Sequence, residues 1–261
     1  MTTEPRLRVT QADGVAVITL NRAEAGNAID LPLAAELLKE VARCDEDTSV
    51  RCVVLAATGP FFCVGGDLQG MADAGDEIDS FVKELVDTFH HAVIKLARMN
   101  KPLVTVVHGA AAGAGVSLAI LGDIALAAQS AHFTWAYNKV GFTPDGGISW
   151  FLPRLIGLRR TQEFALLGKK LSAADAAAYG LITRVVPDEQ LMAEAMETAQ
   201  ALARSSTAAL GRTRELLLSS YSNGLEEQMA VEAHSITASS ETADGREGLA
   251  AFFQKRKPAF K

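Results

Sequence analysis

Short apolar runs and longer stretches of helical periodicity alternate along most of the chain. The apolar runs are bounded by turn residues and predict β-strands. They lie at 7–10, 15–20, 51–57, 61–64, 104–107, 124–128 and 181–186. The periodic stretches predict helices. They lie at 31–45, 77–98, 116–121, 148–156, 161–167 and 172–179. From 188 to 253 only helical periodicity remains, so the order of elements predicts an α/β fold with an all-helical end.

Two of the predicted strands run into glycines and then into a helical stretch. The strand at 104–107 precedes the glycine cluster 109–115, and the run at 61–64 precedes Gly-Gly-Asp at 65–67. A helix that begins after such a turn has unpaired N–H groups that attract negative charge, and glycine lets a ligand approach the backbone. A tight turn packed in a core has the same pattern. A dinucleotide site and a P-loop are excluded, because the third glycine of the first and the Gly-Lys-Ser/Thr of the second are absent.

Composition and charge narrow the class of protein. The chain has 261 residues, 49% of them hydrophobic, which suffices for one large domain or a domain with an appendage. The mean hydropathy of +0.14 is high for a soluble monomer and indicates apolar surface hidden between subunits. A net charge of -6 argues against a nucleic-acid partner.

Cysteine and histidine usage points away from disulfides and metals. The three cysteines have no C-x-x-C spacing, and the N-terminus lacks the apolar core of a signal peptide, which together predict a cytoplasmic location. No run reaches membrane-spanning length, so no membrane partner is expected. The five histidines show no metal-binding spacing, and no metal site is expected. His90 and His91, inside a helical stretch, are interpreted as one packed and one solvated imidazole.

Five segments in a fixed order carry a resemblance to a known family. They are VAVITLNRAEAGNAID, GPFFCVGGDL, KPLVTVVHGAAAGAGVSLAILGDIALAA, FTPDGGISWFLPRLIG and AAAYGLITRVVP. Together they resemble the crotonase, or enoyl-CoA hydratase/isomerase, superfamily over nearly the whole chain. The resemblance implies a spiral of β-β-α units at 1–200 and a helical trimerisation region at 201–261. It also implies a homotrimer or a dimer of trimers, an acyl-CoA thioester as substrate, and no permanently bound cofactor.

The resemblance assigns two backbone donors to the thioester oxygen. The matching positions are Gly66 and Ala114, whose N–H groups would form an oxyanion hole. Proton removal beside the carbonyl, or addition to a conjugated double bond, puts negative charge on that oxygen. Donors aimed at the oxygen therefore stabilise the enolate more than the substrate. Alanine at position 114 is no obstacle, because only its N–H is used.

The residues expected to act as acid and base match the family pattern less well than the two backbone donors do. Hydratases of this family use two glutamates, and the matching positions here are Ser117 and Tyr137 or a close neighbour. Neither is a carboxylate, so ordinary hydration is in doubt. Asp145 lies in a Pro-Asp-Gly turn where isomerases of the family often carry one acidic residue, and one carboxylate suffices to move a proton between two carbons. Asp145 in such a turn also fits a simple helix cap.

Binding of the CoA moiety is assigned by resemblance to two loops and the basic tail. The residues are Ala23, Ala25, Val64, Gly65, Gly66, Asp67, Leu68 and Lys257. A solvated charged tail is the other interpretation of Lys257.

Three functions follow from this pattern. The leading one is an isomerase that shifts a double bond in an enoyl-CoA, or rearranges a ring-type acyl-CoA, through an enolate. The alternatives are an enoyl-CoA hydratase with an atypical water site at Ser117, and an acyl-CoA-binding family member with little catalysis.

Overall fold

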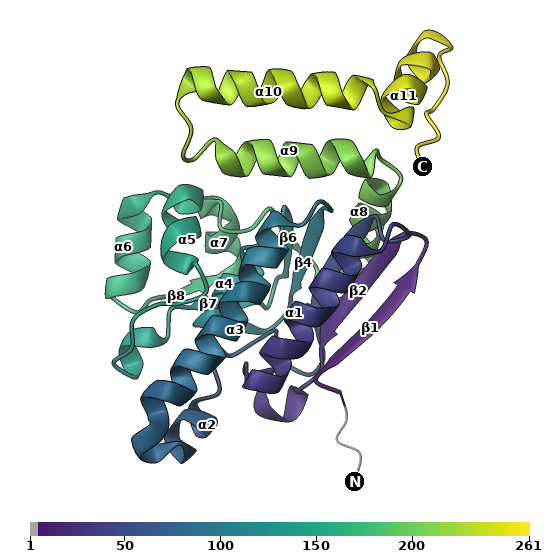
Figure 1. The fold of residues 1–261 in the computed structure, drawn as a ribbon. Helices are drawn as coiled ribbons and strands as arrows, with labels where there is room; N and C mark the ends of the chain where they lie inside the picture. Colours follow the sequence, from purple (N-terminus) through teal and green to yellow (C-terminus); the bar gives the residue numbers. More distant parts are fainter. Residues whose placement is uncertain (1–4) are drawn as a thin grey trace.

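A six-stranded sheet forms the centre of the protein in a computed structural model that describes residues 5–261 (Figure 1). The first two strands form an antiparallel hairpin around the left-handed Asp13 and Gly14, and the other strands run parallel. In their order across the sheet the strands are β1 (Leu7–Ala12), β2 (Val15–Leu20), β3 (Cys52–Ala57), β4 (Leu103–Val107), β6 (Ile124–Ala128) and β9 (Arg184–Val186).

Three short strands outside the main sheet form a second, smaller sheet. Its strand β5 comes directly after β4 and its strand β7 after β6, so the chain repeats units of two strands and a helical segment. The strands are β5 (Ala110–Ala112), β7 (His132–Thr134) and β8 (Lys170–Ser172). The mixed α/β architecture with β-β-α units confirms the predicted fold class.

Helices cover both faces of the main sheet, which explains why every side chain of β4 is buried. Helices α1 and α3 lie side by side in front of the sheet in Figure 1, and α8 packs on β3, β4 and β6. These three helices are α1 (Leu31–Glu46), α3 (Ile78–Arg98) and α8 (Leu191–Ala203). As predicted, Asp30 caps α1: its carboxylate accepts a hydrogen bond of 2.8 Å from the N–H of Leu33.

Shorter helices connect the strands. They are α2 (Leu68–Asp73), α4 (Ala114–Ala119), α5 (Ile148–Ile156), α6 (Leu158–Leu166) and α7 (Ala173–Tyr179). Single 3₁₀ turns also occur. They are η1 (Ala23–Ala25), η2 (Gly75–Glu77), η3 (Tyr137–Lys139) and η4 (Asp188–Gln190).

The last three helices extend beyond the sheet. They are α9 (Thr207–Ser219), α10 (Leu225–Ser240) and α11 (Ala243–Phe253). Figure 1 shows α9 and α10 as an antiparallel pair above the body. Arg214 attaches α9 by hydrogen bonds to the carbonyl oxygens of Leu96 and Met99 and by an ion pair with Asp123. No side chain of α10 is buried within this chain.

Several local predictions differ from the structure, among them the helix predicted at 161–167, which spans Leu158–Leu166. The predicted strand at 61–64 is a single β-bridge between Cys63 and Ala111, because the chain there turns into a loop. The last strand begins at 184 rather than 181, after the turn that follows α7. Helix α4 begins at 114, two residues earlier than predicted, since Gly113 supplies the turn before it.

Neither a membrane-spanning helix nor a metal-binding cluster occurs in the part of the chain that the structure describes. None of its helices combines the length and apolar character needed to cross a bilayer. Within residues 5–261, no three His, Cys, Asp or Glu side chains are grouped so that they could hold a metal ion.

Candidate active site

The two glycine loops of the sequence lie against each other, because each follows the carboxyl end of one of two neighbouring parallel strands, β3 and β4. The N–H of Ala112 donates to the carbonyl oxygen of Cys63 at 2.9 Å. A Cβ on Gly115 would lie only 2.1 Å from that same oxygen, so glycine is required for this approach. The contact brings the start of α4 beside residues 63–66.

The N–H of Gly66 is turned away from its neighbouring segment by a β-bridge. Gly66 pairs with Ile29 in parallel fashion: the N–H of Ile29 donates to Gly65 O at 2.8 Å, and the N–H of Asp67 donates to Ile29 O at 3.0 Å. Because successive groups of an extended chain alternate sides, the N–H of Gly66 points to the opposite side from Ile29.

The N–H of Ala114 is free for a different reason. Ala114 is the first residue of α4, and the first N–H groups of a helix have no intrahelical acceptor. Gly113 before it has φ 52° and ψ -125°, a conformation that glycine adopts readily. Within residues 5–261, the N–H groups of Gly66 and Ala114 have no hydrogen-bond acceptor, and both residues line one cavity. The sequence resemblance assigns these two groups to an oxyanion hole, and for that reason they are called the oxyanion amides below.

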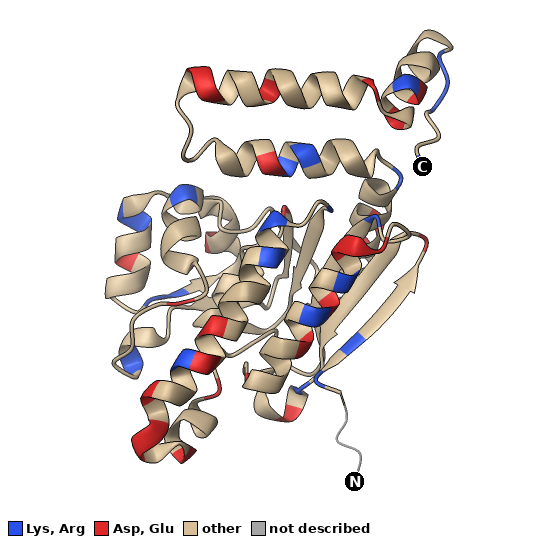
Figure 2. Ribbon diagram, viewed as in Figure 1, with Lys and Arg blue, Asp and Glu red and all other residues tan. Residues whose placement is uncertain are grey.

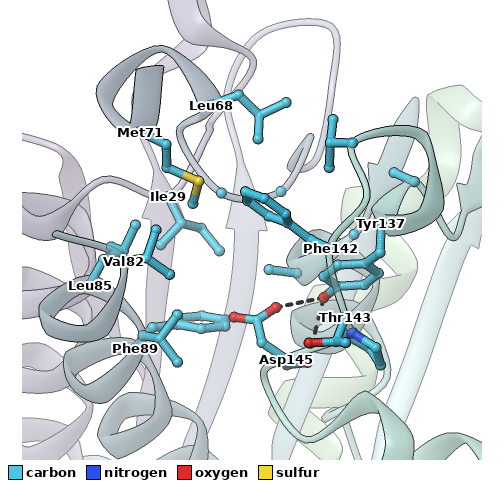
Figure 3. A pocket seen from close by; sticks show the side chains of 18 of the residues that line it. Ile29, Leu68, Met71, Val82, Leu85, Phe89, Tyr137, Phe142, Thr143 and Asp145 are labelled. Carbon is cyan, nitrogen blue, oxygen red and sulfur yellow. Dashed lines mark hydrogen bonds between the residues drawn. The ribbon is translucent and has the colours of Figure 1, made fainter. Parts of the chain in front are cut away.

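The cavity that they line, the first cavity, has a volume of about 890 Å³ and mostly apolar walls. Figure 3 shows its side chains from α2 and α3 on one side and from the loop that precedes α5 on the other. The apolar side chains are those of Ile29, Leu68, Met71, Val82, Leu85, Phe89 and Phe142.

Asp145 and Tyr137 face each other in this cavity. The hydroxyl of Tyr137 donates to Oδ1 of Asp145 at 2.6 Å (Figure 3). Burial of Tyr137 and the negative charge of Asp145 raise the pKa of the tyrosine well above its ordinary value, so Tyr137 stays a hydrogen-bond donor. Trp135 packs edge-on against the Tyr137 ring at 5.4 Å between centroids and fixes its orientation.

Ser117 lies behind Asp145 rather than in the cavity. It is fully buried, and its hydroxyl donates to the backbone oxygen of Asp145 at 3.1 Å. Ser117 therefore holds the Asp145 loop. The hydroxyl of Ser117 is directed at a main-chain carbonyl, and Ser117 does not line the first cavity.

His90 also belongs to this group, although no sequence motif predicted it. Its Nε2 lies 2.9 Å from the N–H of Gly146 and 4.0 Å from Oδ2 of Asp145. The interpretation of His90 and His91 as one packed and one solvated ring missed this, because the partners are more than 50 positions away and on another loop.

The residues assigned to the CoA moiety divide into two groups. Val64, Gly65, Gly66 and Leu68 line the first cavity. Asp67 does not line it; its carboxylate caps α2 through the N–H of Gly70 and pairs with Arg22 at 2.8 Å.

The other residues assigned to the CoA moiety lie outside the cavity lining. Ala23 and Ala25 form η1, and the following Gly26 accepts a hydrogen bond from the N–H of Val64 at 3.1 Å, so η1 lies beside the cavity loop. Lys257 is exposed in the tail after α11. The tail is held on α11 by Arg256, which forms an ion pair with Glu247.

Charged residues lie in the wall of the first cavity and in the neighbouring turn between α2 and α3. Lys83 and Lys139 line it, and Lys83 pairs with Asp87 one turn along α3. Figure 2 shows red segments gathered at the turn between α2 and α3. This turn carries Asp73, Asp76, Glu77 and Asp79. Anionic groups of a ligand are therefore favoured near the lysines and disfavoured at this turn.

Comparison with known proteins identifies what this arrangement is similar to. The model of a family described as enoyl-CoA hydratase/isomerase matches residues 10–261. The 1,2-epoxyphenylacetyl-CoA isomerase of Escherichia coli (strain K12) is 38% identical over 255 residues, 95% of each chain. A protein of Rhodobacter capsulatus named as a probable enoyl-CoA hydratase is 36% identical over 97% of each chain. The crystal structure of an enoyl-CoA hydratase from Polaromonas sp. JS666 superposes with a TM-score of 0.94 at 30% identity, covering 98% of this chain and 99% of that one.

Proposed function

Because this chain belongs to the enoyl-CoA hydratase/isomerase family, we propose that it is an acyl-CoA isomerase that moves a double bond through an enolate. The oxyanion amides of Gly66 and Ala114 hold the thioester oxygen, and the carboxylate of Asp145 carries the proton. The observation that carries this proposal is the meeting of two unbonded N–H groups and one tyrosine-bound carboxylate in a single apolar cavity.

The amides account for the stabilisation of charge. When a proton leaves the carbon beside the thioester carbonyl, its electron pair moves onto the carbonyl oxygen. Two fixed N–H donors in an apolar cavity stabilise that oxygen without rearranging, and each is worth roughly 3–4 kcal/mol in comparable sites. The apolar side chains around them strengthen the interaction, because they exclude water from it.

Asp145 accounts for the proton transfer. Its Oδ1 is held by Tyr137, which leaves Oδ2 to take a proton from the α-carbon of a β,γ-enoyl thioester. The resulting dienolate takes the proton back at the γ-carbon, and the double bond then lies between the α- and β-carbons. No second acid is needed, since one carboxylate performs both transfers.

Asp145 is distinct from the other carboxylates that line the cavity. Asp87 is exposed and paired with Lys83, and Asp79 is exposed in the first turn of α3. Ser117 is engaged with the Asp145 backbone. This arrangement favours isomerisation over hydration, which in this family depends on two carboxylates.

The test compares wild type, Asp145→Asn and the control Asp87→Asn on three substrates: a β,γ-enoyl-CoA, an α,β-enoyl-CoA in water, and 1,2-epoxyphenylacetyl-CoA. We expect wild type and Asp87→Asn to isomerise at least one substrate, and Asp145→Asn to lose about 10²- to 10⁴-fold in kcat with thioester affinity retained. Hydration of the α,β-enoyl-CoA without isomerisation by wild type would identify a hydratase. Thioester binding without turnover would identify a binding protein.

A further inference from the structure

The His90 imidazole accepts a hydrogen bond at the turn that carries Asp145. The donor is the main-chain N–H of Gly146, 2.9 Å from Nε2. A backbone N–H only donates, so Nε2 must be the acceptor, and the ring is neutral with its proton on Nδ1. The same Nε2 lies 4.0 Å from Oδ2 of Asp145, the carboxylate oxygen that Tyr137 does not bind.

Three separate elements hold the Asp145 turn. Ser117 on α4 binds its backbone oxygen, Tyr137 on η3 binds Oδ1, and His90 on α3 binds the N–H of the next residue. Gly146 has φ 63°, and a Cβ there would lie 2.8 Å from the Phe89 ring and 2.9 Å from Ser117. The turn therefore has little room to move, and His90 is the one of these three side chains whose bonding atom accepts a hydrogen bond and could instead hold a proton.

We propose that His90 is a positioning residue for Asp145 and that it works only as the neutral imidazole; this rests on the proposed function of Asp145. Protonation of Nε2 removes the acceptor of the Gly146 N–H, so the turn loses one of its three attachments. It also puts a positive charge beside Oδ2, which stabilises the carboxylate and makes it a weaker base. Both effects lower the rate of proton abstraction as the pH falls.

The other charged groups near His90 either form ion pairs of their own or lie at a distance from its ring along the helix that carries them. On α3 itself they are Asp87, which is bound to Lys83, the adjacent His91, and Arg98 two turns on. A second cavity of about 1070 Å³ borders the opposite side of His90 and Asp145, with Arg214 and Glu215 of α9 in its wall. Arg214 is paired with Asp123. The His90 side chain is 40% exposed, so protons from solvent reach it.

The pH profile of kcat tests the proposal with three variants. His90→Gln supplies an oxygen acceptor at the same reach but does not titrate. We expect it to keep kcat within about threefold of wild type at pH 8 and to lose less activity than wild type as the pH falls, because its acceptor cannot be protonated. His90→Ala should lose about tenfold in kcat at pH 8 with KM unchanged. His91→Ala, the matched control on the same helix, should behave as wild type.

A purely structural role for His90 would lower the thermal stability of His90→Ala but leave the pH profile of His90→Gln equal to that of wild type. That equality would overturn the proposal. Removal of the acid limb by His91→Ala would overturn it as well.

A second measurement separates this proposal from the function of Asp145. In the full-length protein with 13C-labelled histidine, the Cε1 signal of His90 reports its protonation without any turnover. We expect the signal to report the neutral ring with its proton on Nδ1 in wild type and equally in Asp145→Asn, because the donor to Nε2 is the main-chain N–H of Gly146. A ring protonated on Nε2 at the pH of highest turnover would reject the role of His90 alone. The neutral ring in an Asp145→Asn variant that still isomerises would reject the proposed function of Asp145.

Discussion

The hydroxyl of Tyr137 and Oδ1 of Asp145 lie 2.6 Å apart, in a hydrogen bond between a buried phenol and a carboxylate that lines the same cavity. Since burial and the Asp145 charge both raise the pKa of Tyr137, the phenol keeps its proton throughout the range in which enzymes work. It therefore orients one carboxylate oxygen and leaves the other available.

Tyr137→Phe should lower kcat with little change in KM. A hydrogen bond to a charged group contributes about 1.5–3 kcal/mol, so we expect a loss of roughly ten- to hundredfold in kcat as the carboxylate gains freedom to rotate. Steady-state kinetics on the isomerised thioester measure the loss. Tyr179→Phe, at a tyrosine that packs under Arg160, is the control and should keep wild-type kinetics. Equal kcat in both variants would contradict an orienting role for Tyr137.

Ala114→Pro should remove one oxyanion amide while keeping helix α4. Proline is well tolerated at the first position of a helix, where its missing N–H has no intrahelical partner. We expect kcat to fall about 10²- to 10³-fold and the thermal midpoint to change little. Ala114→Ser keeps the N–H and serves as the control. If the proline variant turned over as fast as the serine variant, the N–H of residue 114 would have no part in catalysis.

Arg22→Met should destabilise the loop that carries Gly66. The guanidinium binds Asp67 at 2.8 Å and Ala28 O at 3.0 Å, and its side chain is only 14% exposed. Loss of this partly buried pair should cost about 2–3 kcal/mol of the free energy of unfolding, between the values for exposed and buried pairs. Urea unfolding measures this change in free energy. We expect kcat to fall as well, because Asp67 is the residue after Gly66 and its ion pair with Arg22 helps to fix the position of the Gly66 N–H.

The control for that experiment is Arg43→Met, which removes pairs with Glu40 and Asp47 that are more exposed than the Arg22 pair and lie along α1 or at its end. It should cost less than about 1 kcal/mol and leave kcat unchanged. Equal costs for the two arginines would contradict a structural role for the Arg22 pair.

The C-terminal tail should detach from α11 only in strong acid. The Arg256 guanidinium, helped by the N–H of Ala259, lowers the pKa of Glu247 from 4.5 to about 2. A carboxyl whose pKa is depressed on folding stabilises the folded contact fully above its unfolded pKa and loses that contribution as the pH falls through the folded value. The contact is therefore complete above about pH 4.5 and lost toward about pH 2. The amide chemical shift of Ala259 should follow this titration in wild type and not in Glu247→Gln.

Sequence patterns predicted the elements that depend on local chemistry. The Asp13-Gly14 hairpin, the Asp30 cap and the alternation of strands and helices are all confirmed, since each depends on residues within a few positions of one another. The three-residue strands β5 and β8 were not predicted, because pairing across the second sheet and not composition makes them strands.

The site residues that belong to local sequence motifs could be predicted. The contacts between side chains that are far apart in the sequence could not. Gly66, Ala114, Tyr137 and Asp145 line one cavity as their motifs suggested, although their roles stay predictions. The inward turn of Ser117 toward a main-chain oxygen follows from the packing of α4 against the Asp145 loop, which sequence alone does not give. The same holds for His90, which meets that loop only after the chain has folded.

The two donors that we propose for the thioester oxygen both belong to peptide groups, and this has a consequence for how related proteins diverge. Every amino acid except proline supplies the same N–H, so ordinary substitutions at positions 66 and 114 leave the donors in place as long as the backbone keeps its path. Proton-handling groups are side chains, and one codon change replaces them. Related proteins can therefore come to catalyse a different reaction while they still bind the thioester oxygen in the same way.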